Sequence, residues 1–382
     1  MAKIVILGGG FAAVSAAEVL APFASEHEVT LISNKRDFTF FPGIVPMVFG
    51  DLEEKELHFD LKKVVEKRGI RVVQGSVKGV SPEFKTIALA GDEHDWLAYD
   101  FLIVAMGRRL DRDRIPGLRE HANHLLTVEA AEAFKDAVAA FKKGPIVLGM
   151  CPGSSLPIPV CESALALAGR FENEIAAGNV SITVIFPSTL ETALAGSGLF
   201  RDVEGEFAAR GISLVSEYPI ERVTETTIES PLAGPIRHDL LLLIPPFAGH
   251  SALAELNATG AGHGFLSVDE HLQVKGISGV YAAGDIADMP GPKFGFSAIR
   301  QGRIAAMNVL DELKGRSPGN RYKHEIPWIL GEEYTDPIYF HYGFWDDTAN
   351  GFEDGALFGM AKLIRERYGK VNVKSFARLA GA

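Results

Sequence analysis

The glycine-rich segment near the start of the 382-residue chain restricts its fold more than any other feature. Lys3–Leu7 has the pattern of a short buried strand, Gly8–Gly10 form a turn, and Ala12–Leu20 is alanine-rich and helical. Glu28–Ser33 has the pattern of a second strand. A strand, a turn, a helix and a further strand in this order predict a β-α-β unit.

The turn reads Gly8-x-Gly10-x-x-Ala13, the glycine fingerprint of a dinucleotide site. Gly8 permits the tight turn, Gly10 lets the backbone approach a pyrophosphate, and the small Ala13 allows close packing of helix and strand. The helix N-terminus then offers free N–H groups to the phosphates. An acidic residue that would hold the ribose hydroxyls is missing, since the second strand ends in Ser33-Asn34. These side chains can still form hydrogen bonds to hydroxyls, without the charge.

The rest of the chain predicts a second module of the same kind. Further strands are expected at 71–77, 86–90, 99–107, 144–149, 181–186, 240–244 and 279–285, and a helix at 297–313. Residues 144–149 start a second Rossmann-like unit. We therefore predict an α/β fold with two Rossmann-like dinucleotide-binding domains, the second inserted in the first. The expected boundaries are 1–115 with 245–320, 116–244, and a C-terminal aromatic and amphipathic segment at 321–382.

Composition excludes several other classes. Lys and Arg number 38 against 49 Asp and Glu, and the resulting net charge of −11 disfavours nucleic-acid binding. Two cysteines are too few for a disulfide-stapled scaffold or a cysteine-rich metal site. His121 and His124 have helical spacing without further ligands, so we expect a surface pair and no metal.

The chain opens on its first strand without a leader pattern, and no apolar run is long enough to span a bilayer. We expect a cytoplasmic protein, soluble or peripheral on the cytoplasmic membrane.

Several motifs together resemble the two-dinucleotide-binding-domain flavoproteins, relatives of the pyridine nucleotide-disulfide oxidoreductases. The Gly8–Ala13 turn, the strand end at Val104–Gly107 and the turn Ala283-Gly-Asp285 carry this resemblance. Finer matches are similar to the sulfide:quinone oxidoreductases and to the flavoprotein subunit of flavocytochrome c sulfide dehydrogenase. They are Ile32-Ser-Asn34, Phe38-Thr-Phe40 with Pro42, Pro245-Pro-Phe-x-Gly249, Ser267–His271 and Gly291–Phe296, within roughly residues 1–310.

The resemblance implies FAD as the cofactor and Asp285 on its ribityl or pyrophosphate part. The implied FAD-binding residues are Gly8, Gly10, Phe11, Ala12, Ser33, Asn34, Pro42, Val77, Ala105, Met106, Gly107, Gly284, Asp285 and Lys293. Lys293 would lie near the flavin N1/O2 edge, where a cation stabilises the anionic reduced flavin. The alternative is a solvated loop lysine.

The second module lacks the features of a nicotinamide site. Gly149 is followed by a segment with Pro152, Pro157 and Pro159, which predicts an extended loop instead of an immediate helix. The strand at 181–186 ends in Pro187-Ser188, with no acid where one would hold a ribose. We therefore expect no NAD(P)H binding by this module.

The sulfide-oxidising branch carries an active cysteine in this loop, at the position of Leu156, and a second one in its C-terminal third. Here the cysteines are Cys151 and Cys161, and none follows Cys161. Three interpretations stay open: a local redox pair whose thiol pKa is lowered by a helix opening at Cys161-Glu162, one cysteine acting with an external thiol or sulfide, or two small buried hydrophobes. Glu162 is either a proton relay or an ordinary first-turn glutamate.

Aromatic residues gather at 328–345, and Leu357, Met360, Ala361, Ile364 and Tyr368 follow helical spacing among basic residues. This basic amphipathic tail suggests docking onto an anionic membrane, where the flavin would meet a lipid-soluble quinone. A helix packed on its own protein or on a second subunit is the alternative.

The leading hypothesis is an FAD-dependent oxidoreductase that takes two electrons from sulfide or a small sulfur compound and passes them to a quinone. The alternatives are an NAD(P)H:quinone oxidoreductase and a flavoprotein electron-transfer subunit that needs a protein partner.

Overall fold

The computed structural model describes residues 1–90, 96–196, 199–257, 262–323, 325–330 and 338–343. Its first sheet is parallel throughout, with the strand order β19-β9-β1-β2-β5. The strands are β1 (Lys3–Leu7), β2 (Glu28–Ser33), β5 (Arg71–Gln74), β9 (Phe101–Val104) and β19 (Val280–Ala282). The central strand β1 is apolar because both of its faces are covered: Ile4 to Leu7 are each at most 2% exposed.

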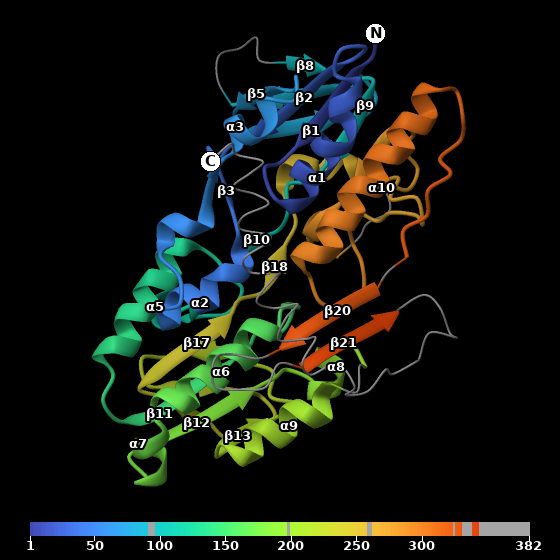
Figure 1. The fold of residues 1–382 in the computed structure, drawn as a ribbon. Coiled ribbons are helices and arrows are strands. Elements are labelled where there is room, and N and C mark those ends of the chain that lie inside the picture. Colours follow the sequence, from blue (N-terminus) through green and yellow to red (C-terminus); the bar gives the residue numbers. More distant parts are fainter. Residues whose placement is uncertain (91–95, 197–198, 258–261, 324, 331–337, 344–382) are drawn as a thin grey trace.

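Two helices pack against each other beside this sheet, α1 (Phe11–Leu20) and α10 (Gly295–Leu313) (Figure 1). Gly302 of α10 makes the close approach possible, because a Cβ there would lie 2.1 Å from the carbonyl oxygen of Ala12. The contact brings the start of the chain against a segment almost 300 positions away.

The second sheet is also parallel, with the order β13-β12-β11-β17. Its strands are β11 (Gly144–Met150), β12 (Val180–Ile185), β13 (Ile212–Val215) and β17 (Leu240–Ile244). One face carries the helices α5 (Val128–Ala140), α6 (Ile158–Arg170) and α9 (Leu199–Ala209). The other face packs on a small antiparallel sheet of β14 (Arg222–Val223), β15 (Thr227–Glu229) and β16 (Ile236–Arg237).

The remaining elements are short. They are the helices α2 (Ile44–Phe49), α3 (Leu61–Glu66), α4 (Leu118–His121), α7 (Glu172–Ala176) and α8 (Leu190–Ala193), the sheet β6 (Val77–Ser81), β7 (Thr86–Leu89) and β8 (Trp96–Ala98), and the pairs β3 (Asp37–Thr39) with β4 (His58–Asp60) and β20 (Glu325–Leu330) with β21 (Ile338–Gly343).

The chain crosses between the two parallel sheets through one antiparallel pair, β10 (Arg109–Leu110) with β18 (Phe247–Ala248). Figure 1 shows this pair between the two sheets. The predicted α/β class with two Rossmann-like modules, the second interrupting the first, is confirmed. The domain boundaries proposed from the sequence stay a prediction.

Two local expectations were wrong. The strand expected at 71–77 is divided into β5 and β6, which belong to different sheets, because the backbone leaves the first sheet after Gly75 N donates to Ser33 O at 2.9 Å. Helix α6 begins at Ile158 and not at Cys161, because Pro159 fits the first helical turn, where no N–H is needed.

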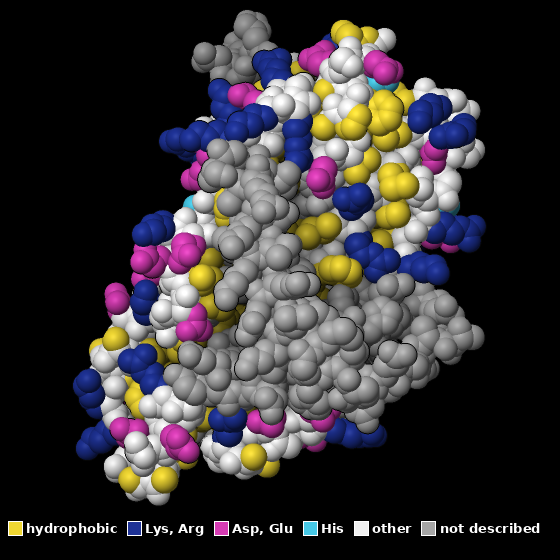
Figure 2. Space-filling view, viewed as in Figure 1, with side chains coloured by type: hydrophobic (Ala, Val, Ile, Leu, Met, Phe, Trp, Pro, Cys, Tyr) yellow, Lys and Arg dark blue, Asp and Glu magenta, His cyan; other side chains and the backbone are white. Residues whose placement is uncertain are grey.

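On the face drawn in Figure 2, acidic and basic side chains are interspersed over the described surface. The net charge of −11 is therefore not gathered into one acidic patch on that face. Among the helices that the structure describes, none is long and apolar enough to cross a membrane. The amphipathic tail at 357–368 lies outside the described residues.

Candidate functional site

The turn between β1 and α1 has the geometry that a dinucleotide site needs. Gly8 has φ +124°, and a Cβ on it would lie 2.1 Å from Ala105 O, so only glycine fits. Gly10 precedes α1, and a Cβ on it would meet nothing within 4 Å. No side chain caps this helix end. The first N–H groups of α1 therefore face a space that can receive a phosphate.

The Gly284–Asp285 turn lies against the same helix. Gly284 has φ +78°, and a Cβ there would lie 3.2 Å from the Cβ of Ala12. Its N–H donates to Gln301 Oε1 of α10 at 2.7 Å. The glycine turn after β1, the turn after β19 and the start of α10 thus meet at the carboxyl edge of the first sheet, where ligands bind in open α/β folds.

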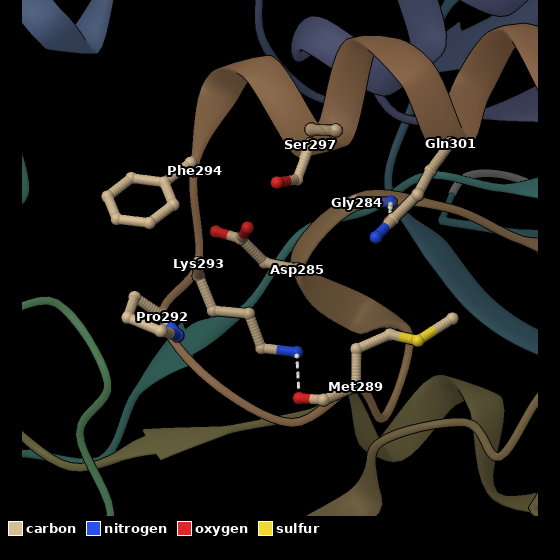
Figure 3. A pocket seen from close by; sticks show the side chains of 9 residues that line it. Gly284, Asp285, Met289, Pro292, Lys293, Phe294, Ser297 and Gln301 are labelled. Atoms are coloured by element: carbon tan, nitrogen blue, oxygen red, sulfur yellow. Dashed lines mark hydrogen bonds between the residues drawn. The ribbon is translucent and has the colours of Figure 1, made fainter. Parts of the chain in front are cut away.

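A small pocket opens at this meeting point (Figure 3). Its lining consists of Gly284, Asp285, Met289, Pro292, Lys293, Phe294, Ser297, Ala298 and Gln301. The Ser297 hydroxyl and the Asp285 carboxylate lie near each other in it, and the Lys293 ammonium reaches towards the Met289 carbonyl. Ser297 Oγ is buried and has no hydrogen-bond partner in the described part of the chain, so it is available to a ligand.

Lys293 is a partly buried cation of this pocket. Its Nζ donates to Ala287 O at 2.7 Å and to Met289 O at 3.5 Å, and lies 5.5 Å from the centroid of the Phe265 ring. The pKa of Lys293 is lowered to about 8, chiefly by burial; the charge of Asp288 opposes this shift and that of Arg108 adds to it. The interpretation as a solvated loop lysine is therefore wrong.

Arg108 is a residue of the site that sequence reasoning missed. Its guanidinium forms an ion pair with Asp285 and lies 4.2 Å from the centroid of the Phe247 ring. Burial lowers the pKa of Arg108 to about 10. The signal for it was a cation directly after the strand end at Ala105–Gly107, in the position where residues of parallel strands converge.

The other implied FAD residues are placed as follows. Ser33 is buried, its Oγ accepts from Lys35 N at 3.1 Å, and Asn34 is exposed. The Phe11 ring packs edge-on against Phe38, with ring centroids 4.9 Å apart. Ala105 touches the Gly8 turn through its carbonyl, and Gly107 makes a left-handed turn at φ +69°. Met106 lies between these two residues, and Pro42 and Val77 are not among the pocket residues.

The two cysteines are free and fully buried. They lie on opposite faces of the second sheet: Cys151 packs with Tyr218 on the side of β14–β16, and Cys161 packs among the helices. Burial raises the pKa of both thiols, and the charge of Glu162 raises that of Cys161 further.

The expectation of a low-pKa thiol at a helix opening is therefore wrong. Helix α6 starts three residues before Cys161. The Cys161 side chain therefore lies inside the helix and not at its start, and it packs in the core of the second module. The structure favours the third interpretation, two small buried hydrophobes. Glu162 is partly exposed on α6, and its role as a proton relay stays a prediction.

The loop 151–157 nevertheless borders the site. Lys293 N donates to Ser155 O and Phe247 N donates to Gly153 O, both at 3.0 Å. Leu156, at the position of the family's cysteine, is partly buried against the core of the second module. The loop is thus hydrogen-bonded to the segment that carries Lys293 and to the segment that carries Phe247, whose ring lies beneath Arg108.

The histidine expectation needs a correction. His121 is exposed at the end of α4, whereas His124 is buried beyond it and burial lowers its pKa to about 4. The two are not a surface pair. Over the described ranges no cluster of His, Cys, Asp and Glu could hold a metal ion.

Comparisons with known proteins agree with this geometry. The family model described as pyridine nucleotide-disulphide oxidoreductase matches residues 2–149. The mitochondrial sulfide:quinone oxidoreductase of Dictyostelium discoideum is 23% identical over 370 residues, covering 92% of this chain and 80% of the relative. A probable NADH dehydrogenase of the same organism is 21% identical over 308 residues, covering 75% of this chain and 68% of the relative.

Among solved structures, the sulfide:quinone oxidoreductase of Aquifex aeolicus superposes with a TM-score of 0.80 at 18% identity, covering 98% of this chain and 92% of that one. The fold and the glycine turn agree with these matches: the chain is similar to the pyridine nucleotide-disulphide oxidoreductases over its first 149 residues and to the sulfide:quinone oxidoreductases over most of its length. These similarities identify it as an FAD-dependent oxidoreductase.

The residues present fit FAD. The uncapped start of α1 and the open space at Gly10 suit its diphosphate, and the Ser297 hydroxyl and the Lys293 ammonium line the pocket beside the Gly284–Asp285 turn. The flavin, when bound, supplies two-electron redox chemistry.

Proposed function

We propose that the protein takes two electrons from sulfide or a related small sulfur compound and passes them through FAD to a quinone. The relatives named for sulfide and quinone, which align over most of the chain, support the proposal. A named NADH dehydrogenase also aligns, so the donor has to be argued from the residues themselves.

The segment after β11 is the observation that carries the choice of donor. A nicotinamide-binding module needs a glycine turn that opens directly onto a helix, whose N–H groups hold the pyrophosphate. Here β11 ends at Met150, residues 151–157 form a loop, and α6 starts only at Ile158. A dinucleotide therefore lacks its phosphate cradle in this module, whereas a small donor needs none.

Lys293 stabilises negative charge in the pocket. Its ammonium is held by two backbone carbonyls, which fix its position without neutralising it. A fixed cation in a buried site stabilises charge that develops during a reaction more than a solvated one does, since no solvent has to reorganise. We expect Lys293 to favour electron transfer into the site for this reason.

The sulfur leaves the site on an external nucleophile. Hydrosulfide that gives up two electrons yields zero-valent sulfur, which forms an S–S bond to a second sulfide or to a small thiol. The quinone takes up the two electrons with two protons and becomes a quinol. Cys151 and Cys161 take no part, because both thiols are buried and their pKa is raised by burial.

We propose that the protein binds the quinone at a membrane surface. The sequence of the tail at 357–368 supports peripheral docking through its basic, amphipathic pattern. A homo-oligomer that covers the same tail is the competing arrangement.

The test is anaerobic reduction of the FAD-loaded protein. We expect sulfide to bleach the flavin absorbance, a short-chain quinone to restore it, and NADH at the same concentration to do neither. Cys151→Ala and Cys161→Ala should keep the wild-type reduction rate. Bleaching by NADH and not by sulfide would instead establish the NAD(P)H:quinone alternative, and bleaching by neither would favour a subunit that needs a protein partner.

A further inference from the structure

The Asp285 carboxylate places a negative charge at the site of an anionic cofactor. It lines the pocket with its side chain 19% exposed, beside a helix start that fits a diphosphate. Two anions that share a poorly hydrated site repel each other unless a cation lies between or behind them. Arg108 is in direct contact with this carboxylate.

The topology of the first sheet brings Arg108 and Asp285 together. Strands β9 and β19 are parallel neighbours, with Val104 opposite Ala282 in register. Ala283 N donates to Val104 O at 2.9 Å, so the two chains leave the sheet side by side. Gly107 then turns at φ +69°, and Gly284 turns at φ +78°. Each turn is followed at once by one member of the pair.

The Arg108 guanidinium is fixed by its neighbours, but one of its hydrogen-bond donors has no acceptor in the described part of the chain. Its side chain is 16% exposed and lies over the Phe247 ring. Its Nε is buried and has no hydrogen-bond partner among the described residues. A guanidinium offers five N–H donors, and a buried donor without an acceptor is costly. An anionic oxygen of a ligand in the pocket would complete this set.

We propose that Arg108 is a positioning residue of the FAD site: it balances the charge of Asp285 and thereby sets the affinity for FAD and the redox potential of the bound flavin. The inference rests on FAD as the cofactor and not on the identity of the donor or the acceptor.

Removal of Arg108 leaves Asp285 as an uncompensated anion beside the cofactor. For Arg108→Met we expect the reduced flavin to be about tenfold less favoured relative to the oxidised form, which corresponds to a midpoint potential about 30 mV lower for a two-electron couple. The dissociation constant of FAD should rise by about tenfold, since the diphosphate then meets the carboxylate alone. Arg108→Lys, which keeps the charge, should recover most of both quantities.

The opposite change should move the potential in the opposite direction. Asp285→Asn leaves the Arg108 cation unbalanced and should raise the midpoint potential, and the double variant should return close to the wild-type value. Arg109→Met removes the neighbouring exposed arginine and should change neither quantity. The potential is measured by titration with a chemical reductant and redox dyes, and FAD binding by flavin fluorescence.

Each outcome decides the proposal separately from the choice of donor, because no natural substrate is used. Equal potentials of wild type and Arg108→Met, or shifts of the same sign in Arg108→Met and Asp285→Asn, would overturn it. If Arg108→Met does not hold FAD at all, the potentials of Arg108→Lys, Asp285→Asn and the double variant still test the charge balance. An unshifted potential in Asp285→Asn would then contradict the proposal.

Discussion

Lys293 is a cation that the protein keeps in its interior at a cost. The ammonium has two carbonyl acceptors and an aromatic neighbour, and nothing in the described pocket faces it with a full negative charge at contact distance. Burial therefore disfavours its charged form, and its pKa falls to about 8. Such a cost at one residue is typical of a site that is selected for chemistry and not for stability.

This cost predicts how stability depends on pH. Between pH 8 and 10.5 the unfolded chain keeps the proton on Lys293 while the folded protein releases it, so stability rises with pH in this window. Lys293→Met should be more stable than wild type at pH 7, by roughly 2 kcal/mol after the lost hydrogen bonds are allowed for. The difference should shrink as the pH rises from 8 to 10.

Urea unfolding at a fixed concentration of FAD, at pH 7, 8.5 and 10, measures this difference. Lys275→Met, which removes an exposed lysine, controls for the loss of the charge itself. A gap between Lys293→Met and wild type that does not change with pH would show that Lys293 titrates outside the window.

At the scale of elements, the packing of α1 on α10 links the fold to the site. Helix α1 begins at the phosphate-facing turn, and α10 begins beside Lys293. Gly302 in the middle of α10 lets the two helices approach closely. The distance between these helices therefore fixes how the two sides of the cofactor site are spaced.

Gly302→Ala should separate them. The new Cβ would lie 2.1 Å from a backbone oxygen of Ala12, which cannot rotate away. We expect a loss of about 1–3 kcal/mol in the free energy of unfolding, as for other overpacked cores, together with weaker FAD binding. Gly205→Ala is the matched control, because Gly205 lies in helix α9 and a Cβ there would meet nothing within 4 Å.

The control should be slightly stabilising, by about 0.5–1 kcal/mol, since alanine replaces glycine in an exposed helix. Thermal unfolding and FAD titration of both variants check the pair of expectations. Equal FAD affinity in Gly302→Ala and wild type would show that the helix spacing does not control the site.

Elements whose residues are buried on all sides were predicted well from the sequence. The bounds of β1, β2 and β17 agree with the apolar runs at 3–7, 28–33 and 240–244. The run at 71–77 was not resolved into two strands, because alternation alone does not show which sheet a strand joins. The start of α6 was missed because proline was interpreted as a breaker, although it fits a first turn.

At the scale of the whole molecule, the site depends on contacts that no local pattern contains. Gly8, Gly10 and Asp285 could be predicted because each lies in a short motif with a known physical role. The pair of Arg108 and Asp285 spans 177 positions and arises only when β9 and β19 become neighbours. The burial of the cysteines on two faces of one sheet likewise follows from tertiary packing.

The loop 151–157 connects the second module to the cofactor site and gives a test at this scale. Gly153 has φ +83°, and a Cβ there would lie 2.7 Å from Arg114 Nη1. Arg114 donates through Nη2 to Phe247 O at 3.2 Å, and the Phe247 ring supports Arg108. A displaced Arg114 would therefore disturb the residue that balances Asp285.

Gly153→Ala should weaken FAD binding several-fold in addition to destabilising the fold. Gly178→Ala is its control, because Gly178 has φ +72° and a Cβ there would meet nothing within 4 Å. Both variants force alanine into the left-handed region at a cost of about 1–2 kcal/mol, so urea unfolding should give similar losses. FAD fluorescence titration should show weaker binding for Gly153→Ala than for Gly178→Ala, since of the two new Cβ atoms only the one at position 153 would meet Arg114. Equal FAD affinities of the two variants would mean that the second module holds the loop without acting on the cofactor site.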